Sequence, residues 1–138
     1  MSQVTVHGSC LCGSVKYEIR GEAKRFYHCH CNRCRKASGA GFTSNLLVTP
    51  KTSITWLQGE SFLAKYKVPE SSRFYNRFCL KCGATMPYVL SLLDAVIVPA
   101  GSLDTGAPIM PQGHAFWDSR SEWSCVEGLP VFSEYPDG

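Results

Sequence analysis

Two short stretches, Gly8-Ser-Cys-Leu-Cys-Gly13 and Cys79-Leu-Lys-Cys-Gly83, decide the fold of this chain because they hold four of its eight cysteines. A Cys-x-x-Cys-Gly segment is typical of a zinc knuckle, in which a tight turn directs both sulfurs toward one point and the glycine takes a positive φ. Four thiolates at about 2.3 Å from zinc lie about 3.8 Å apart, whereas alternate Cα atoms of a flat strand are about 6.6 Å apart. We therefore expect the chain to bend at the first pair.

These two pairs predict a closed structural zinc site, because four protein ligands leave no position for a substrate. Its ligands would be Cys10, Cys12, Cys79 and Cys82. Structural zinc affinities of roughly 10–16 kcal/mol exceed the stability of a typical domain, so this metal would decide whether the chain folds. The alternative is that the four are free cysteines that pack as small apolar side chains.

A second group of cysteines lies in His28-Cys-His-Cys-Asn-Arg-Cys34. The sulfurs of Cys29, Cys31 and Cys34 come from one short loop, so they can occupy three corners of a tetrahedron and leave the fourth open. That arrangement is typical of a catalytic zinc, where water or substrate completes the coordination. Two alternatives remain: a site closed by a histidine (His7, His28, His30 or His114), and a different grouping with either distant cysteine pair.

The remaining cysteine and the C-terminal aromatic residues carry no motif. Cys125 stands alone, and we expect it to be an ordinary buried thiol. Phe116, Trp117 and Trp123 are expected to be core or lid aromatics.

Length and composition predict one all-β domain over residues 1–138. At 138 residues, with 44% apolar and 18% charged residues, the chain is neither disordered nor fibrous. Apolar residues alternate at period two near residues 15–19, 62–68 and 73–78, and 96–98 is a short apolar run, so we expect strands there. One short helix is expected over roughly Asn32 to Ser38, and residues 100–113 read as a long loop.

Targeting and membrane signals are not found. The first residues lack a basic start and an apolar run, and the longest apolar stretch, 89–100, is interrupted by Asp94 and Pro99. We therefore expect a cytoplasmic protein without membrane contact. Thiols stay reduced in that compartment, where clustered cysteines more often bind metal than form disulfides.

The charge distribution favours a small anionic ligand over nucleic acid. The formal net charge is +3, but seven thiolates and two Zn²⁺ ions would bring it near zero. Residues 16–36 nevertheless carry seven basic residues against two acidic ones, whereas residues 117–138 carry five acidic residues and one basic one. This distribution indicates either solvated faces of opposite charge or an anion-attracting field around the cysteines at 29–34.

The ordered motifs closely resemble the glutathione-dependent formaldehyde-activating enzyme (Gfa-like) family, which includes centromere protein V. They are the segments 8–13, 29–35 with Gly39-Ala-Gly41, and 78–83, and the resemblance spans roughly residues 7–132. It implies a β-tent of small antiparallel sheets with two zinc ions and at most one or two short helical turns. It also implies the structural site and the catalytic site described above.

The resemblance further implies a carbon–sulfur lyase-type reaction that joins glutathione to formaldehyde as S-(hydroxymethyl)glutathione. The open zinc position is expected to bind the thiol rather than to polarise the aldehyde, since three thiolates weaken the Lewis acidity of the metal. The residues expected to steer the glutathione carboxylates are Arg25, Arg33, Arg35 and Lys36. Two other functions stay open: a zinc-stabilised module that binds protein or nucleic acid, and a metal or redox buffer. The chain is expected to be a monomer or a homodimer.

Overall fold

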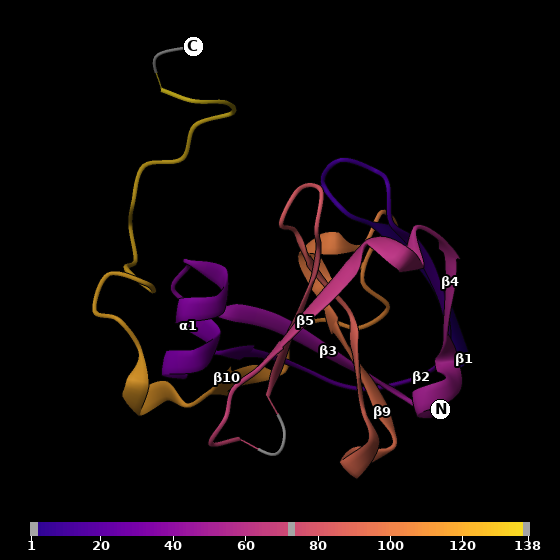
Figure 1. Ribbon diagram of the computed structural model, residues 1–138. Coiled ribbons are helices and arrows are strands. Elements are labelled where there is room, and N and C mark those ends of the chain that lie inside the picture. The colour runs from indigo at the N-terminus through magenta and orange to yellow at the C-terminus, as the bar shows by residue number, and fades with distance from the viewer. Residues whose placement is uncertain (1–2, 72–73, 137–138) are drawn as a thin grey trace.

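The computed structural model describes residues 3–71 and 74–136, which form two β-sheets and one α-helix (Figure 1). The strands are β1 (Gln3–Ser9), β2 (Lys16–Cys29), β3 (Thr43–Thr49), β4 (Ile54–Gln58), β5 (Leu63–Lys67), β6 (Tyr75–Cys79), β7 (Thr85–Met86), β8 (Tyr88–Leu90), β9 (Ala95–Pro99) and β10 (Gly113–Ala115). The helix is α1 (Asn32–Ser38). Short 3-10 turns are η1 (Lys51–Ser53), η2 (Glu60–Phe62), η3 (Ser91–Leu93), η4 (Ala100–Ser102) and η5 (Trp117–Ser119).

The expected all-β fold of small antiparallel sheets is confirmed, and so is the short helix. α1 starts at Asn32, ends at Ser38, and stops where Gly39 takes a left-handed φ of 68°. The expected strand at 62–68 corresponds to β5, and the one at 73–78 to β6, although residue 73 lies outside the described residues. The long loop at 100–113 contains only the turn η4 and one isolated bridge from Leu103 to Gly8.

Strand β2 organises the larger sheet, because its 14 residues pair with four other strands. β1 and β4 pair with the first half of β2, and β3 pairs with residues 22–29. β10 pairs in parallel with Tyr27–Cys29, whereas the other strand pairs among the described residues are antiparallel. This parallel pairing brings residues 113–115 beside the cysteine-rich end of β2.

The core unites the two sheets. Tyr17 and Ile19 alternate with outward residues along β2 and are fully buried, as the period-two pattern predicts. They belong to the same apolar cluster as Cys79 and Met86 of the smaller sheet. A shared core is what one domain requires, and the domain bounds 1–138 remain a prediction.

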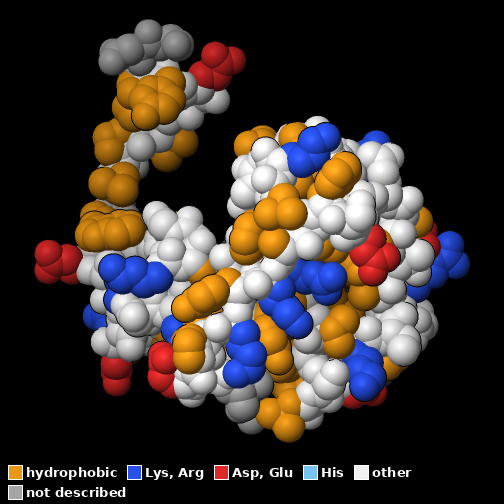
Figure 2. Space-filling model, viewed as in Figure 1, with side chains coloured by type: hydrophobic (Ala, Val, Ile, Leu, Met, Phe, Trp, Pro, Cys, Tyr) orange, Lys and Arg blue, Asp and Glu red, His pale blue; other side chains and the backbone are white. Residues whose placement is uncertain are grey.

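The chain leaves the body after η5. A turn at residues 122–125 lies against Gly41, and residues 126–136 then extend away and carry apolar side chains into solvent (Figures 1 and 2). Of the two alternatives expected for these aromatics, core or lid, the core is excluded for Phe116 and Trp123, which are 66% and 62% exposed. Both lie beyond β10, the last strand, where no further sheet covers them. No helix within the described ranges is long and apolar enough to cross a membrane.

Replacement of Tyr17 by phenylalanine should lower the free energy of unfolding by about 1 kcal/mol. The buried Tyr17 hydroxyl lies 2.6 Å from the Ser102 Oγ, which itself donates to the Pro99 carbonyl at 2.7 Å. Burial raises the pKa of Tyr17 to about 12, so the phenol is neutral and acts as the donor. Urea denaturation would measure the change.

Tyr27→Phe is the matched control, because Tyr27 lies on the same strand but is 38% exposed. Its effect should stay within about 0.5 kcal/mol. Equal effects of the two substitutions would show that the buried hydrogen bond contributes nothing.

Candidate metal centres

Four cysteines from two distant parts of the chain meet where β1 and β6 end. The sulfurs of Cys10, Cys12, Cys79 and Cys82 all lie within 4.8 Å of one another. The sulfur–sulfur distances are 3.6 Å between Cys10 and Cys12 and 4.0 Å between Cys12 and Cys79. These values bracket the spacing of about 3.8 Å that tetrahedral zinc–thiolate geometry requires. The residues present therefore fit a zinc ion.

Two similar turns position these sulfurs. In each, a glycine N–H donates to the carbonyl of the first cysteine: Gly13 to Cys10 at 3.0 Å and Gly83 to Cys79 at 2.7 Å. Both glycines take a positive φ, 78° and 76°, a conformation that other residues rarely adopt. The chain therefore bends directly after Ser9, as expected from the spacing of the first pair.

Backbone N–H groups around the four sulfurs favour the thiolate form. The Val15 N–H donates to the Cys10 sulfur at 3.2 Å, and the Lys81 N–H donates to the Cys79 sulfur at 3.3 Å. Hydrogen bonds from the side chain and backbone of Ser14 lower the pKa of Cys12 to about 6. Burial raises the pKa of Cys79, and a positive ion beside this sulfur would favour its thiolate form.

The second cysteine group lies where β2 runs into α1. Cys29 is the last residue of β2, Cys31 caps the helix, and the Cys31 sulfur accepts from the Cys34 N–H at 3.4 Å. The three sulfurs lie within 4.8 Å of one another. Within the described residues no histidine nitrogen joins the group, and its cysteines stay separate from the group at Cys10. The arrangement thus offers three sulfur ligands from one loop, which fits a zinc ion with an open position.

The pKa values of the thiols in this group shift in opposite directions. A hydrogen bond from the Cys34 thiol lowers the pKa of Cys29 to about 6. The same contact, together with burial, raises the pKa of Cys34. Burial, and then the negative charge of the neighbouring thiols, raises the pKa of Tyr88, which keeps its phenol neutral.

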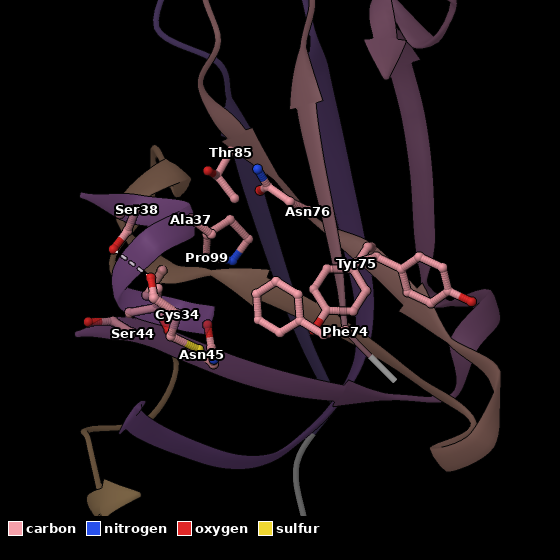
Figure 3. Close-up of a pocket in the computed structure, with 14 residues that line it drawn as sticks. Cys34, Ala37, Ser38, Ser44, Asn45, Phe74, Tyr75, Asn76, Thr85 and Pro99 are labelled. Atoms are coloured by element: carbon pink, nitrogen blue, oxygen red, sulfur yellow. Dashed lines mark hydrogen bonds between the residues drawn. The ribbon is translucent and has the colours of Figure 1, made fainter. Parts of the chain in front are cut away.

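A cavity of about 260 Å³ opens beside Cys34. Figure 3 shows the helix residues Cys34, Ala37 and Ser38 on one side of it, with Asn76 of β6 across from them. Tyr88 also lines this cavity. Because Cys34 of the three-cysteine group lines this cavity, a bound molecule can approach that group from here.

A second, more polar cavity adjoins the first. Its volume is about 390 Å³, and it shares Ala37, Phe74 and Asn76 with the cavity at Cys34. Arg33 and Lys36 line only this outer cavity. The α1 helix therefore presents two basic residues to the outer cavity and a cysteine to the inner one.

The other two basic residues expected to steer an anion lie elsewhere. The Arg35 guanidinium donates to Asn32 Oδ1 at 3.4 Å, and Arg25 lines a third cavity together with Cys29. Sequence reasoning missed Phe74, Asn76 and Tyr88 as cavity residues. No motif marks them, because their role depends on how β6 and β8 lie across from α1.

A third cluster contains two histidines and a cysteine. Ligand atoms of His30, His114 and Cys125 lie within 4.8 Å of one another. The prediction of a buried Cys125 was wrong: this cysteine is exposed, because it follows the last turn that packs on the body. His28 stays apart from the cluster and shares a hydrogen bond of 2.9 Å with Ser44.

Comparison with known proteins identifies a matching family and a similar solved structure. The family described as glutathione-dependent formaldehyde-activating enzyme matches residues 5–119. The resemblance expected over roughly residues 7–132 therefore extends beyond the matched region at its C-terminal end. A crystal structure of a Rhodobacter sphaeroides protein covers 79% of this chain and 99% of its own, with a TM-score of 0.59 and 21% sequence identity. At that identity the likeness concerns the fold.

Proposed function

Because this chain belongs to the glutathione-dependent formaldehyde-activating enzyme family, we propose that it is a zinc-dependent carbon–sulfur lyase-type enzyme. Its substrate would be the adduct of glutathione, or a related thiol, with formaldehyde, as in an S-(hydroxymethyl)glutathione synthase. The observation that carries this proposal is the three-cysteine group at the wall of a cavity whose outer neighbour is basic.

The proposed metal centres follow the two cysteine groups. A structural zinc would be held by Cys10, Cys12, Cys79 and Cys82, and a catalytic zinc by Cys29, Cys31 and Cys34. When bound, the second ion supplies a positive charge that favours the deprotonated form of a substrate thiol.

The outer cavity would hold the charged part of glutathione. Glutathione has two carboxylates and one ammonium group, so it is net negative at neutral pH. Arg33 and Lys36 would donate charge-assisted hydrogen bonds to these carboxylates and direct the thiol toward Cys34. Holding the thiol beside the aldehyde in the inner cavity removes most of the entropic cost of their encounter.

Tyr88 would stabilise the aldehyde oxygen. In the synthetic direction a carbon–sulfur bond forms, the carbonyl double bond becomes single, and the thiol proton ends on the oxygen. A neutral phenol at the cavity wall can donate a hydrogen bond to that oxygen as negative charge develops on it. The lyase direction reverses each of these changes.

We also propose the cytoplasm as the location, because reduced thiols at the seven ligand positions require a reducing compartment. There the protein would work as a single domain, as a monomer or a homodimer.

The activity itself can be tested by following adduct formation from glutathione and formaldehyde against the spontaneous rate. Arg33→Gln should raise the KM for glutathione about tenfold, equivalent to ~1.4 kcal/mol of lost binding. Lys24→Gln is the matched control, because Lys24 belongs to the same basic segment but pairs with Glu22 at 3.2 Å. It should leave KM unchanged.

Zinc-loaded protein that neither binds glutathione nor exceeds the spontaneous rate would contradict the proposed activity. An equal KM for Arg33→Gln and Lys24→Gln would contradict the proposal that the outer cavity binds glutathione.

The two metal centres should differ in their effect on stability. Cys82→Ser should lose the structural zinc and unfold the protein, since that ion would link β1 to the end of β6. Cys34→Ser should lose the other zinc and keep the fold, because its three ligands come from one loop. Zinc content and thermal unfolding would measure both effects, and equal losses in melting temperature would show that the two roles are wrongly assigned.

A further inference from the structure

We propose that His30, His114 and Cys125 form a third metal site, for zinc or a similar divalent transition metal, which fastens the segment after residue 119 to the larger sheet. The site is separate from both cysteine groups, so this inference does not depend on the proposed activity.

The sheet itself brings the two histidines together. β10 pairs in parallel with β2, with His114 opposite His28 and Ala115 opposite Cys29. The ladder continues as the His30 N–H donates to the Ala115 carbonyl at 3.0 Å. As a result Nε2 of His30 lies 2.9 Å from Nδ1 of His114. Two nitrogens held this closely need to separate only to about 3.3 Å to bind one tetrahedral zinc.

His30 is an unusual core residue. It is 0% exposed, and Phe42 and Trp117 lie against its ring with centroid distances of 5.0 and 5.3 Å. Its Nδ1 is buried, and no hydrogen-bond partner for it occurs among residues 3–71 and 74–136. Its Nε2 is directed at the exposed His114 ring. Because the ring packs against Phe42 and Trp117 with Nε2 directed at His114, the two imidazoles are held close enough to share a metal ion.

Cys125 reaches the histidines because the backbone packs closely at Gly41. The Ser124 N–H and Oγ both bond to the Ser121 carbonyl, at 3.2 and 2.8 Å, and this turn places Cys125 next in the chain. A β-carbon at Gly41 would lie 2.5 Å from the β-carbon of Ser124. The glycine is therefore what allows residues 124–125 to sit beside the histidine pair.

Two imidazoles and one thiolate are a donor set that zinc accepts, with water in the fourth position. Binding releases the Cys125 thiol proton. Both imidazoles stay neutral, and each carries its proton on the nitrogen that faces away from the ion. His114 and Cys125 are exposed, so a metal ion has access from solution.

The location of the site suggests its role. His30 and His114 belong to the region that matches the family, residues 5–119, and Cys125 lies beyond it. An ion held by all three would tie the extended segment 126–136, with its exposed apolar side chains, to the end of β2. It would thereby hold that segment in place next to α1.

The test compares metal uptake between variants of the full-length protein that keep their resident metal. Equilibrium dialysis against buffered Zn²⁺ should load wild-type protein with one equivalent more than Cys125→Ser or His114→Gln. His7→Gln is the histidine control, because His7 is exposed and pairs with Glu18 at 2.9 Å, away from the cluster. It should retain the extra equivalent. With Co²⁺ as the probe, wild type should show an additional thiolate-to-cobalt absorption band that Cys125→Ser lacks.

A second pair of variants tests the position of Cys125 without removing a ligand. Gly41→Ala should weaken binding of the extra Zn²⁺ at least tenfold and speed proteolysis within 126–136. Gly106→Ala should do neither, because no atom lies within 4 Å of the added β-carbon. Equal metal uptake by wild type, Cys125→Ser and His114→Gln would overturn the proposal and leave a hydrogen-bonded histidine pair beside a free thiol. Equal binding by Gly41→Ala and Gly106→Ala would overturn the role given to Gly41.

Discussion

The contact between the sulfurs of two distant turns is the constraint on which the rest of this structure depends. Cys12 and Cys79 are 67 positions apart in the chain, and their sulfurs lie 4.0 Å from each other. One turn ends β1 of the larger sheet, and the other follows β6 of the smaller sheet. Four thiols held this close repel one another once they ionise, so the arrangement favours a cation at its centre.

The long strand β2 links the body of the larger sheet to the three-cysteine group. Its first half is held between β1 and β4, and its second half between β3 and β10. Successive side chains of a strand point to opposite faces, so the end of β2 directs Cys29 and His30 into different surroundings. Cys29 joins the three-cysteine group, whereas His30 meets His114. One short stretch thus contributes to two distinct clusters.

The features that could be predicted from the sequence are those that depend on local spacing. The Cys-x-x-Cys-Gly turn, the bend before Cys12 and the helix from Asn32 to Ser38 follow from residues next to one another. The structure assembles the two cysteine groups that were expected, and their metal ligation remains a proposal. Features that depend on long-range packing could not be predicted. The parallel pairing of β10 and the cavity residues Phe74, Asn76 and Tyr88 result from contacts between distant segments. The exposure of Cys125 could not be predicted, because an isolated cysteine in a sequence does not indicate whether other residues cover it.

Zinc-edge X-ray absorption of the purified protein with two equivalents of zinc, with and without glutathione, tests the central claim most directly. One closed four-sulfur site and one open three-sulfur site predict an average of about 3.5 sulfur ligands per zinc without glutathione. Saturating glutathione should raise this average to about 4 as its thiol fills the open position. An average of 4 before glutathione is added, or no increase afterwards, would contradict the division of the seven sulfurs into a closed group and an open one.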